Sequence, residues 1–332
     1  MPRPPADAAA ASACKPALAA YHPVPVTDLL PRYPAELSGF AFGDAPINRS
    51  DALRDDPDAL AQLWARGRVI VLDADGSAFA DEAGKLLVTR GDALGAGPGT
   101  AVFLGRHGDE AWFSVEADVL ALQAPQRVDL RRAAAAWSAA DASAFAFARA
   151  MQHWRSRSRH CGICGGVVEF RRAGYVAHCT QCGADHYPRV DPAVIVAVSD
   201  GERLLLGRQA SWPAQRYSVV AGFVEPGESL EQTVVREVFE ETRVRVRSCR
   251  YLGAQPWPFP GALMLGFVAD AEPDVPQVDG ELEDARWFTV EEIAAARLRK
   301  GDDASGILLS PRISIARSLI EHWYATVTAG DR

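Results

Sequence analysis

The chain has 332 residues, 48% of them hydrophobic and 23% charged, so it can form two or three globular domains with buried cores. Its 43 acidic and 35 basic residues give a formal net charge of -8, which argues against a general nucleic-acid binder but permits a local basic patch. No stretch approaches the roughly 20 apolar residues that span a bilayer, so we expect a cytoplasmic protein with no membrane partner. Six cysteines are too few for a disulfide scaffold in a chain of this length.

Two segments precede the first cysteine pair. Residues 1–37 are rich in Pro and Ala without periodicity, which predicts a disordered extension. Residues 38–156 predict an α+β domain that ends in a long helical stretch over about Asp129–Arg155. Its expected strands are Arg68–Leu72, Lys85–Thr89, Thr100–Leu104 and Ala111–Val115. No internal repeat is evident, and this domain contains no motif with recognisable chemistry.

Two CxxC pairs lie within residues 157–187, which we expect to form a zinc ribbon with a hairpin of Val167–Phe170 and Tyr175–Ala177. Such knuckles place four thiolates around one tetrahedral Zn²⁺, and a closed four-thiolate shell has a structural role. The ligands are Cys161, Cys164, Cys179 and Cys182. Two disulfides or a redox dithiol are the alternatives, and the flanking His160 and His178 could substitute as ligands.

Arginines gather around this segment in the sequence. They are typical of a solvated surface, but they would also suit contacts with phosphate or RNA. The residues are Arg155, Arg157, Arg159, Arg171 and Arg172.

Residues 188–328 predict a third domain, in which a Gly-rich loop and an acidic helix follow the first strands. The expected strands are Ala193–Val198, Arg203–Leu206, Arg245–Leu252, Ala262–Ala269 and Ala285–Phe288. Helices are expected at Val290–Leu298 and Pro311–Thr326.

The acidic helix is the most informative element. Ser229 and Gln232 form a capping box, which starts the helix at about Leu230, and an apolar stripe follows at four-residue spacing. Glu237, Glu240 and Glu241 then project from adjoining positions, where like charges destabilise a helix unless a cation neutralises them. Mg²⁺ and Mn²⁺ prefer such oxygen ligands. The alternative is an exposed acidic helix with an Arg–Glu pair.

Gly222–Val244 resembles the Nudix box, G-x5-E-x7-R-E-U-x-E-E-x-G-U, in which U is aliphatic. The matching residues are Gly222, Glu228, Arg236, Glu237, Val238, Glu240, Glu241 and Val244. One position departs, because Arg243 replaces the final glycine. A glycine there suits a left-handed helix cap, so we expect the arginine to cost on the order of 1 kcal/mol.

Ala254–Met264, AQPWPFPGALM, resembles the SQPWPFP-x-S-LM element, with Ala254 and Ala262 in place of its serines. Together with the ribbon and the Nudix box, it makes the chain similar to the zinc-ribbon NAD(H) pyrophosphatases (NAD-capped RNA hydrolases) of the Nudix hydrolase superfamily. This resemblance implies an α+β protein in which a Nudix α/β/α sandwich with a mixed sheet follows the ribbon and the N-terminal domain.

The resemblance also implies the site. Catalytic Mg²⁺ or Mn²⁺ would be held by the Ala221 carbonyl, Glu237, Glu241 and Glu281, with Glu283 as the register alternative to Glu281. Glu240 is a further metal or water-positioning candidate, and Glu228 and Arg236 would hold the Gly222 loop against the helix.

Substrate contacts are implied at the proline motif and at two other aromatic residues. From the residues alone, Tyr187 and Phe223 are more typical of core aromatics. The implied substrate-binding residues are Tyr187, Phe223, Gln255, Pro256, Trp257, Pro258, Phe259 and Pro260.

The implied activity is metal-dependent hydrolysis of NAD(H) to nicotinamide mononucleotide and AMP, with removal of NAD caps from RNA 5′ ends, by a homodimer. Two alternatives stay open at this point. The enzyme could prefer another nucleoside diphosphate such as ADP-ribose, or the chain could be a non-catalytic zinc-ribbon module that binds RNA.

Overall fold

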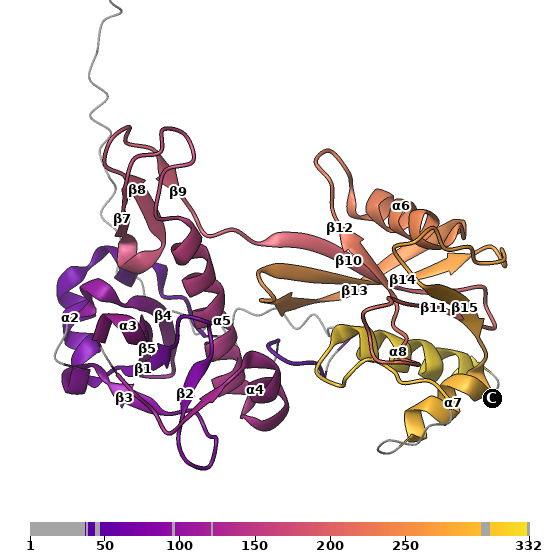
Figure 1. The fold of residues 1–332 in the computed structure, drawn as a ribbon, viewed down its shortest axis with the longest axis horizontal. Helices are drawn as coiled ribbons and strands as arrows, with labels where there is room; N and C mark the ends of the chain where they lie inside the picture. The colour runs from indigo at the N-terminus through magenta and orange to yellow at the C-terminus, as the bar shows by residue number, and fades with distance from the viewer. Residues whose placement is uncertain are drawn as a thin grey trace, which may run out of the picture. The chain divides into compact units, whose positions relative to one another are not determined.

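The computed structural model describes residues 37, 39–43, 47–94, 97–120, 122–299 and 306–330 (Figure 1). The expected disordered extension lies outside the described residues except for Leu37. Leu37 is 3% exposed and, with Phe40, packs against third-domain residues such as Ile195. Leu37 and Phe40 therefore belong to the core of the third domain, although the sequence placed Leu37 in the extension and Phe40 in the first domain.

The first domain is built on a six-stranded sheet in the order β4-β5-β1-β2-β6, with β3 also paired to β1. The central strand, β1 (Arg68–Leu72), is parallel to β5 and antiparallel to β2 and β3. The others are β2 (Ala78–Ala80), β3 (Val88–Arg90), β4 (Val102–His107), β5 (Glu110–Glu116) and β6 (Gln126–Val128). Both faces of β1 are buried, because α2 (Pro57–Arg66) covers one and α5 (Ala139–Arg157) the other.

The expected single helix over Asp129–Arg155 is instead two helices, α4 (Leu130–Ala136) and α5. The break falls at Trp137 and Ser138, which have extended backbone. Ser138 begins α5 as its N-cap, since its side chain accepts a hydrogen bond from the Asp141 amide. Trp137 turns away to donate from Nε1 to the Gly84 carbonyl, at 2.8 Å. A cap and one tertiary hydrogen bond thus override the continuous alanine pattern.

The cysteine segment forms the expected hairpin, β7 (Val168–Arg171) and β8 (Val176–Cys179), with a third strand, β9 (Asp185–His186), on β8. Cys161, Val168 and Cys179 are buried in the same apolar cluster as Trp154 of α5. The ribbon therefore shares the core of the first domain.

The third domain has a second six-stranded sheet, in the order β13-β14-β10-β11-β15 with β12 also on β10. Its strands are β10 (Asp191–Ser199), β11 (Leu204–Arg208), β12 (Val220–Phe223), β13 (Val246–Trp257), β14 (Ala262–Ala271) and β15 (Asp284–Phe288). Helix α6 (Leu230–Thr242) covers one face of β10, and α7 (Val290–Leu298) and α8 (Ile315–Gly330) cover the other (Figure 1). This α/β/α sandwich with a mixed sheet confirms the expected fold class.

The two sheets have the same topology, which no repeat in the sequence reveals. In each, the first strand is parallel to the fifth and antiparallel to the second and third. Between the third and fourth strands, the described part of the first domain has two short 3-10 turns, Gly91–Leu94 and Pro98–Thr100, where the third has α6. Only the third domain therefore presents the acidic helix.

None of the helices in the described ranges combines the length and apolar character that crossing a bilayer requires.

Candidate functional site

The four cysteines converge as their spacing predicts. Their sulfur atoms all lie within 4.8 Å of one another, and no other group of His, Cys, Asp and Glu in the described part of the chain meets that criterion. Cys161 Sγ is 3.7 Å from Cys182 Sγ, and Cys164 Sγ is 3.5 Å from Cys179 Sγ. Four sulfurs at this separation match a tetrahedral thiolate site.

The two knuckles repeat one backbone geometry. The Ile163 amide donates to Cys161 Sγ and the Gln181 amide to Cys179 Sγ, each at 3.4 Å. Gly165 and Gly183 then take φ of 75° and 77°, a left-handed turn that favours glycine. The amide donors stabilise thiolates, so the backbone of each knuckle prepares its cysteines for a metal.

The histidine closest to this cluster is one that the sequence did not single out. Of the two alternative ligands, His160 is exposed, and His178 Nδ1 lies 2.7 Å from an oxygen of Asp185. Instead His186 Nε2 is 3.2 Å from Cys161 Sγ. Strand pairing brings His186 there, because β9 folds back along β8.

Helix α6 begins and ends as its sequence predicts. Both hydrogen bonds of the Ser229–Gln232 capping box are present, and Val234 and Val238 are fully buried. Arg243 ends the helix at φ 59° and ψ 12°, the left-handed conformation expected at this position. Its guanidinium pairs with Asp279 at 3.0 Å, which holds the non-glycine cap in place.

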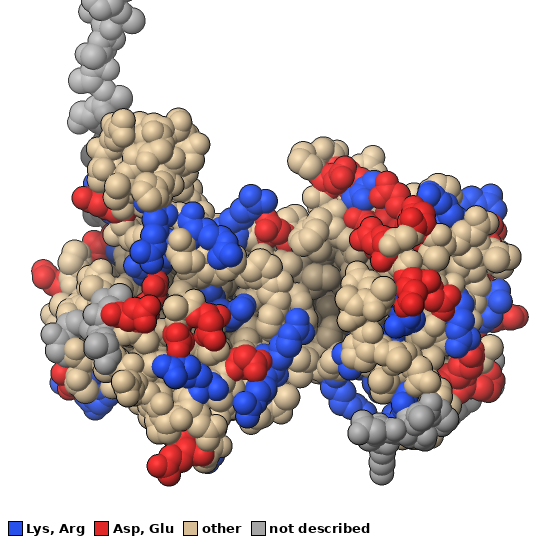
Figure 2. Space-filling view, viewed as in Figure 1, with Lys and Arg blue, Asp and Glu red and all other residues tan. Residues whose placement is uncertain are grey.

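Acidic side chains gather over α6 (Figure 2). The Glu237 side chain packs directly against Gly222 of β12, in the space that a Cβ there would take. Burial raises the pKa of Glu237, and the charges of Glu240 and Glu281 raise it further, whereas the contact with Arg236, at 2.9 Å, opposes this rise.

Glu241 is the most perturbed carboxyl group of the helix. It is 4% exposed, and within the described ranges no hydrogen bond or ion pair reaches its carboxylate. Burial, together with the charges of Glu281, Glu237 and Asp279, raises its pKa to about 8. A buried carboxylate that faces only other acids lacks a counter-charge, so this arrangement suits a bound cation.

Glu281, rather than Glu283, shares this environment. Its charge acts on both Glu237 and Glu241. Glu283 instead forms an ion pair with Arg208. The charges therefore favour Glu281 over Glu283, the two positions that the sequence left open for the downstream glutamate.

Arg236 organises the turn before α6. Its guanidinium binds both carboxylate oxygens of Glu228, at 2.6 and 2.9 Å, and donates to the Phe223 carbonyl at 2.9 Å. It also reaches the half-exposed Glu240 at 3.0 Å. The hydrogen bonds from Arg236 lower the pKa of Glu228 to about 2, so this carboxyl is an anion at neutral pH. The pair joins the loop to the helix, as the sequence predicts.

A cavity of about 190 Å³ adjoins the glutamates. It is lined by Ala221 and Glu241, by Trp257 of the proline motif, and by Ile195 and Met264 of the sheet. Its walls are mostly apolar, with the acidic group at one side. Such a cavity suits a flat, weakly polar ring next to a charged group.

The proline motif begins inside β13 rather than in a loop. Pro256 and Trp257 pair with Leu263 and Ala262 of β14. Because β13 is the edge strand of the sheet, a proline there removes no ladder hydrogen bond to a second neighbour.

Gln255 does not lie where the resemblance implied. It is fully buried, its amide donates to the Ala41 and Ile313 carbonyls, at 2.9 and 2.8 Å, and its oxygen accepts from the Ile315 amide at 2.8 Å. These bonds fix the start of α8, which forms a wall of the cavity, so Gln255 shapes the cavity without facing it.

The rest of the motif has mixed surroundings. Pro258 is buried, its carbonyl accepts a hydrogen bond from Arg149, and Pro260 is exposed. The Phe259 ring lies 4.8 Å from that of Trp257, and the Arg131 guanidinium stacks over it at 4.3 Å. Of the motif, Trp257 and Met264 reach the cavity.

Tyr187 and Phe223 are not core aromatics. They are 63% and 59% exposed, against the expectation from their sequence context. Two large aromatic side chains left open to solvent, one of them next to Gly222, are available to contact a ligand.

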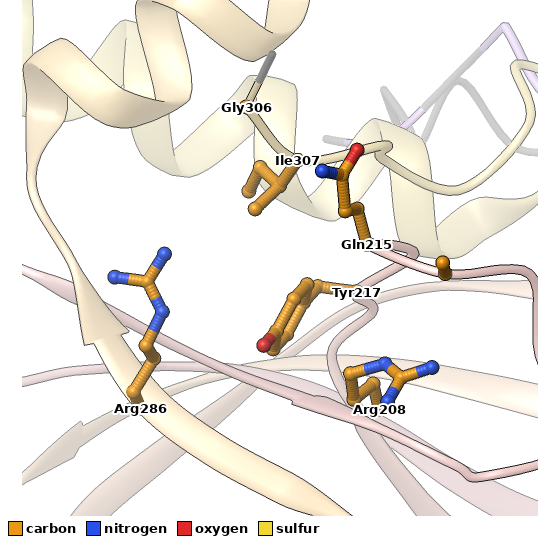
Figure 3. Close-up of a pocket in the computed structure, with 7 residues that line it drawn as sticks. Arg208, Gln215, Tyr217, Arg286, Gly306 and Ile307 are labelled. Carbon is orange, nitrogen blue, oxygen red and sulfur yellow. The ribbon is translucent and has the colours of Figure 1, made fainter. Parts of the chain in front are cut away.

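A second cavity, of about 360 Å³, lies at the β11–β15 edge of the same domain (Figure 3). Arg208, Tyr217 and Arg286 line it, and each already has an acidic partner. The partners are Glu283, Asp284 and Glu292, respectively. None of the predicted site residues lines this cavity. We therefore locate the candidate active site at the glutamates of α6.

Comparisons with known proteins agree with this geometry. The NUDIX domain family matches residues 189–307, and the NADH pyrophosphatase zinc ribbon domain family matches residues 156–187. A Mycobacterium bovis protein named NAD-capped RNA hydrolase NudC is 38% identical over 290 residues, covering 84% of this chain and 92% of its own. A Stutzerimonas stutzeri protein of the same name is 44% identical over 174 residues, covering 52% of this chain and 58% of its own. NAD-capped RNA hydrolase NUDT12 of Macaca fascicularis is 41% identical over 194 residues, covering 55% of this chain and 42% of its own.

Proposed function

Because this chain belongs to the Nudix hydrolases that carry an NADH pyrophosphatase zinc ribbon, the family of the NAD-capped RNA hydrolases, we propose that it hydrolyses the pyrophosphate bond of NAD(H). The products are nicotinamide mononucleotide and AMP, and the same cleavage removes NAD caps from RNA 5′ ends. The observation that carries this proposal is the buried, uncompensated Glu241 at the wall of an apolar cavity.

The donor set fits a hard divalent cation. Glu237, Glu241 and Glu281 offer only carboxylate oxygens, and the charge of Glu281 raises the pKa of both Glu237 and Glu241. With the Ala221 carbonyl they would hold Mg²⁺ or Mn²⁺. Such a cation supplies charge neutralisation at the pyrophosphate and a more acidic bound water.

The chain's own residues do the positioning. Gly222 leaves room for the Glu237 carboxylate against β12, and Arg236, paired with Glu228, donates to the Phe223 carbonyl at the end of this strand. Glu240 is half-exposed and tethered by Arg236, so it can orient a water or accept its proton at the rim of the site.

The base at one end of the substrate is held by apolar contacts. Trp257, Met264 and Ile195 line the small cavity beside Glu241, and the exposed Tyr187 and Phe223 supply further aromatic surface. Burying the nicotinamide there places the adjoining phosphate near the carboxylates. Phe259 supports this wall through its ring contact with Trp257.

The resemblance of the sequence to this family also leads us to propose a homodimer and a cytoplasmic location. On the same basis we propose that the zinc ribbon spans residues 157–187 and the Nudix domain residues 188–328. One zinc per chain is assigned to the cysteines as a structural ion.

The test is product analysis of NADH incubated with the protein and Mg²⁺ or Mn²⁺, separated by chromatography. Equal amounts of AMP and reduced nicotinamide mononucleotide, abolished by a chelator, are expected. No cleavage with either metal would refute the activity.

One observation favours ADP-ribose as an alternative substrate. Ala254 and Ala262 replace the two serines of the proline element, which removes two hydroxyl groups. If the pocket has thereby lost selectivity for nicotinamide, ADP-ribose will be cleaved faster than NADH. Comparing the two rates under one metal decides between these substrates. A non-catalytic RNA-binding module would cleave neither.

A further inference from the structure

A third cavity, of about 350 Å³, lies outside the glutamate site, where the first domain meets the zinc ribbon. Its walls come from the first sheet, from the last turns of α5 and from β7 of the ribbon. Its volume falls within the roughly 300–1,000 Å³ typical of small-molecule sites. Basic side chains gather around this junction (Figure 2).

The charges in this cavity are unbalanced. Arg155 and Arg159, one turn apart on or just beyond α5, both line it, whereas Glu116 is its single acidic lining residue. Arg159 Nη2 is 3.9 Å from Glu116, too long for a hydrogen bond. Like charges at this spacing repel, so a second anion in the cavity would be stabilising.

The Arg155 side chain lacks a hydrogen-bond or ion-pair partner among the described residues. Its Nε is buried without a hydrogen-bond acceptor, and among the described residues no acid lies within ion-pair distance of it. The guanidinium stacks over Phe170 at 4.5 Å, and Trp154 packs edge-on against that ring. Burial lowers the pKa of Arg155, the charge of Glu116 opposes this shift, and the charge of Arg159 lowers the pKa further. The stacking fixes the guanidinium in place while its donors stay free.

The remaining walls suit an uncharged body. Val102, Val115 and Phe170 are apolar, and Gln152, whose amide donates to the Asp73 carbonyl at 2.8 Å, adds one oriented polar group. Two guanidinium groups favour a phosphate over a carboxylate, because it offers three acceptor oxygens and up to two negative charges.

We propose that this cavity binds a small phosphate monoester, with its phosphate at Arg155 and Arg159 and its organic part against Val102 and Phe170. The site is separate from the glutamates and needs no divalent metal. It would give the protein a second, regulatory or product-binding position for mononucleotide-like ligands.

The test is calorimetric titration of the full chain with AMP, ribose 5-phosphate, adenosine and inorganic phosphate, without Mg²⁺ or Mn²⁺. Arg155→Gln is expected to weaken AMP and ribose 5-phosphate binding about 10- to 100-fold, as for loss of charge-assisted hydrogen bonds. Arg157→Gln is the matched control, because Arg157 lies on the same helix, is exposed and contacts His153. Its affinity should stay within about twofold.

Thr100→Tyr provides a second variant should Arg155→Gln not fold, as judged by zinc content and thermal unfolding. Thr100 is exposed and lines the cavity, so a larger side chain obstructs the site without disturbing the core. Loss of monoester binding with unchanged NADH hydrolysis would support the proposal. Unchanged affinity in folded Arg155→Gln or Thr100→Tyr, or adenosine or inorganic phosphate binding as tightly as AMP, would overturn it.

Discussion

The Glu237 carboxylate occupies the space that a side chain at Gly222 would need, so the glycine leaves room for the carboxylate. Gly222 lies in β12 and Glu237 in α6, and the glycine lets the helix approach the strand closely enough for the carboxylate to reach the site. The first glycine of the Nudix box is thus required by close packing at a proposed metal ligand.

Gly222→Ala is expected to lower kcat/KM for NADH by at least about 100-fold, because the new methyl group displaces Glu237 from the site. Steady-state kinetics with Mn²⁺ measures this. Gly99→Ala is the control, since a methyl group there meets nothing within 4 Å. A fully active Gly222→Ala would show that Glu237 is not a required ligand.

Glu241→Gln is expected to reduce turnover about 1,000-fold or more, because it removes the charge of the buried carboxylate that we assign to metal binding. Zinc content should stay at one per chain, which separates this loss from unfolding. Glu231→Gln, an exposed position on the same helix, should keep full activity. Turnover retained in Glu241→Gln would contradict the metal-site assignment.

The raised pKa of Glu241, about 8 against an ordinary 4.5, predicts a pH-dependent stability of the zinc-loaded protein without Mg²⁺ or Mn²⁺. Between these two values the folded protein binds more protons than the unfolded chain, so stability falls as pH rises. Glu241→Gln lacks this penalty. Its Tm should exceed that of the unmodified protein by at least about 2 °C at pH 8, and the gap should shrink toward pH 5. If the Tm values of the two proteins changed in parallel with pH, the raised pKa of Glu241 would be disproved.

Arg236→Lys keeps the charge but loses the two-pronged contact with Glu228. We expect apparent affinity for Mn²⁺ to drop about 10- to 100-fold, the usual effect of removing a group that orients metal ligands. Titrating activity against Mn²⁺ concentration measures this. Arg247→Lys, at an exposed strand position, should leave the curve in place. An unshifted curve for Arg236→Lys would mean that the ligands need no such support.

Arg243→Gly tests the helix cap. Glycine relieves a left-handed conformation that costs a side chain about 1 kcal/mol, whereas the exposed pair with Asp279 contributes about 0–1 kcal/mol. The expected net result is stability unchanged or raised by up to about 1 kcal/mol, measured by urea unfolding. In an Asp279→Asn background the gain should be larger, because the ion pair is already absent. A marked loss in both backgrounds would refute this interpretation.

The local patterns of the sequence determined much of this protein. The zinc knuckles, the Ser229 cap, the buried stripe of α6 and the left-handed Arg243 follow from residues within a few positions of one another. Hydrogen bonds and side-chain contacts over such short spans are set by helix and turn geometry. Even so, a cap and one tertiary hydrogen bond at Trp137–Ser138 split a helix that the alanine pattern made continuous.

Only the tertiary structure decided the rest. It placed Glu281 rather than Glu283 with the acidic helix, buried Gln255 and exposed Tyr187 and Phe223. It also showed that two domains share one sheet topology. These outcomes depend on which distant segments meet, and the burial and charge that each side chain feels come from partners dozens or hundreds of residues away. A sequence pattern records that a residue is apolar or charged, but its environment exists only once the chain has folded.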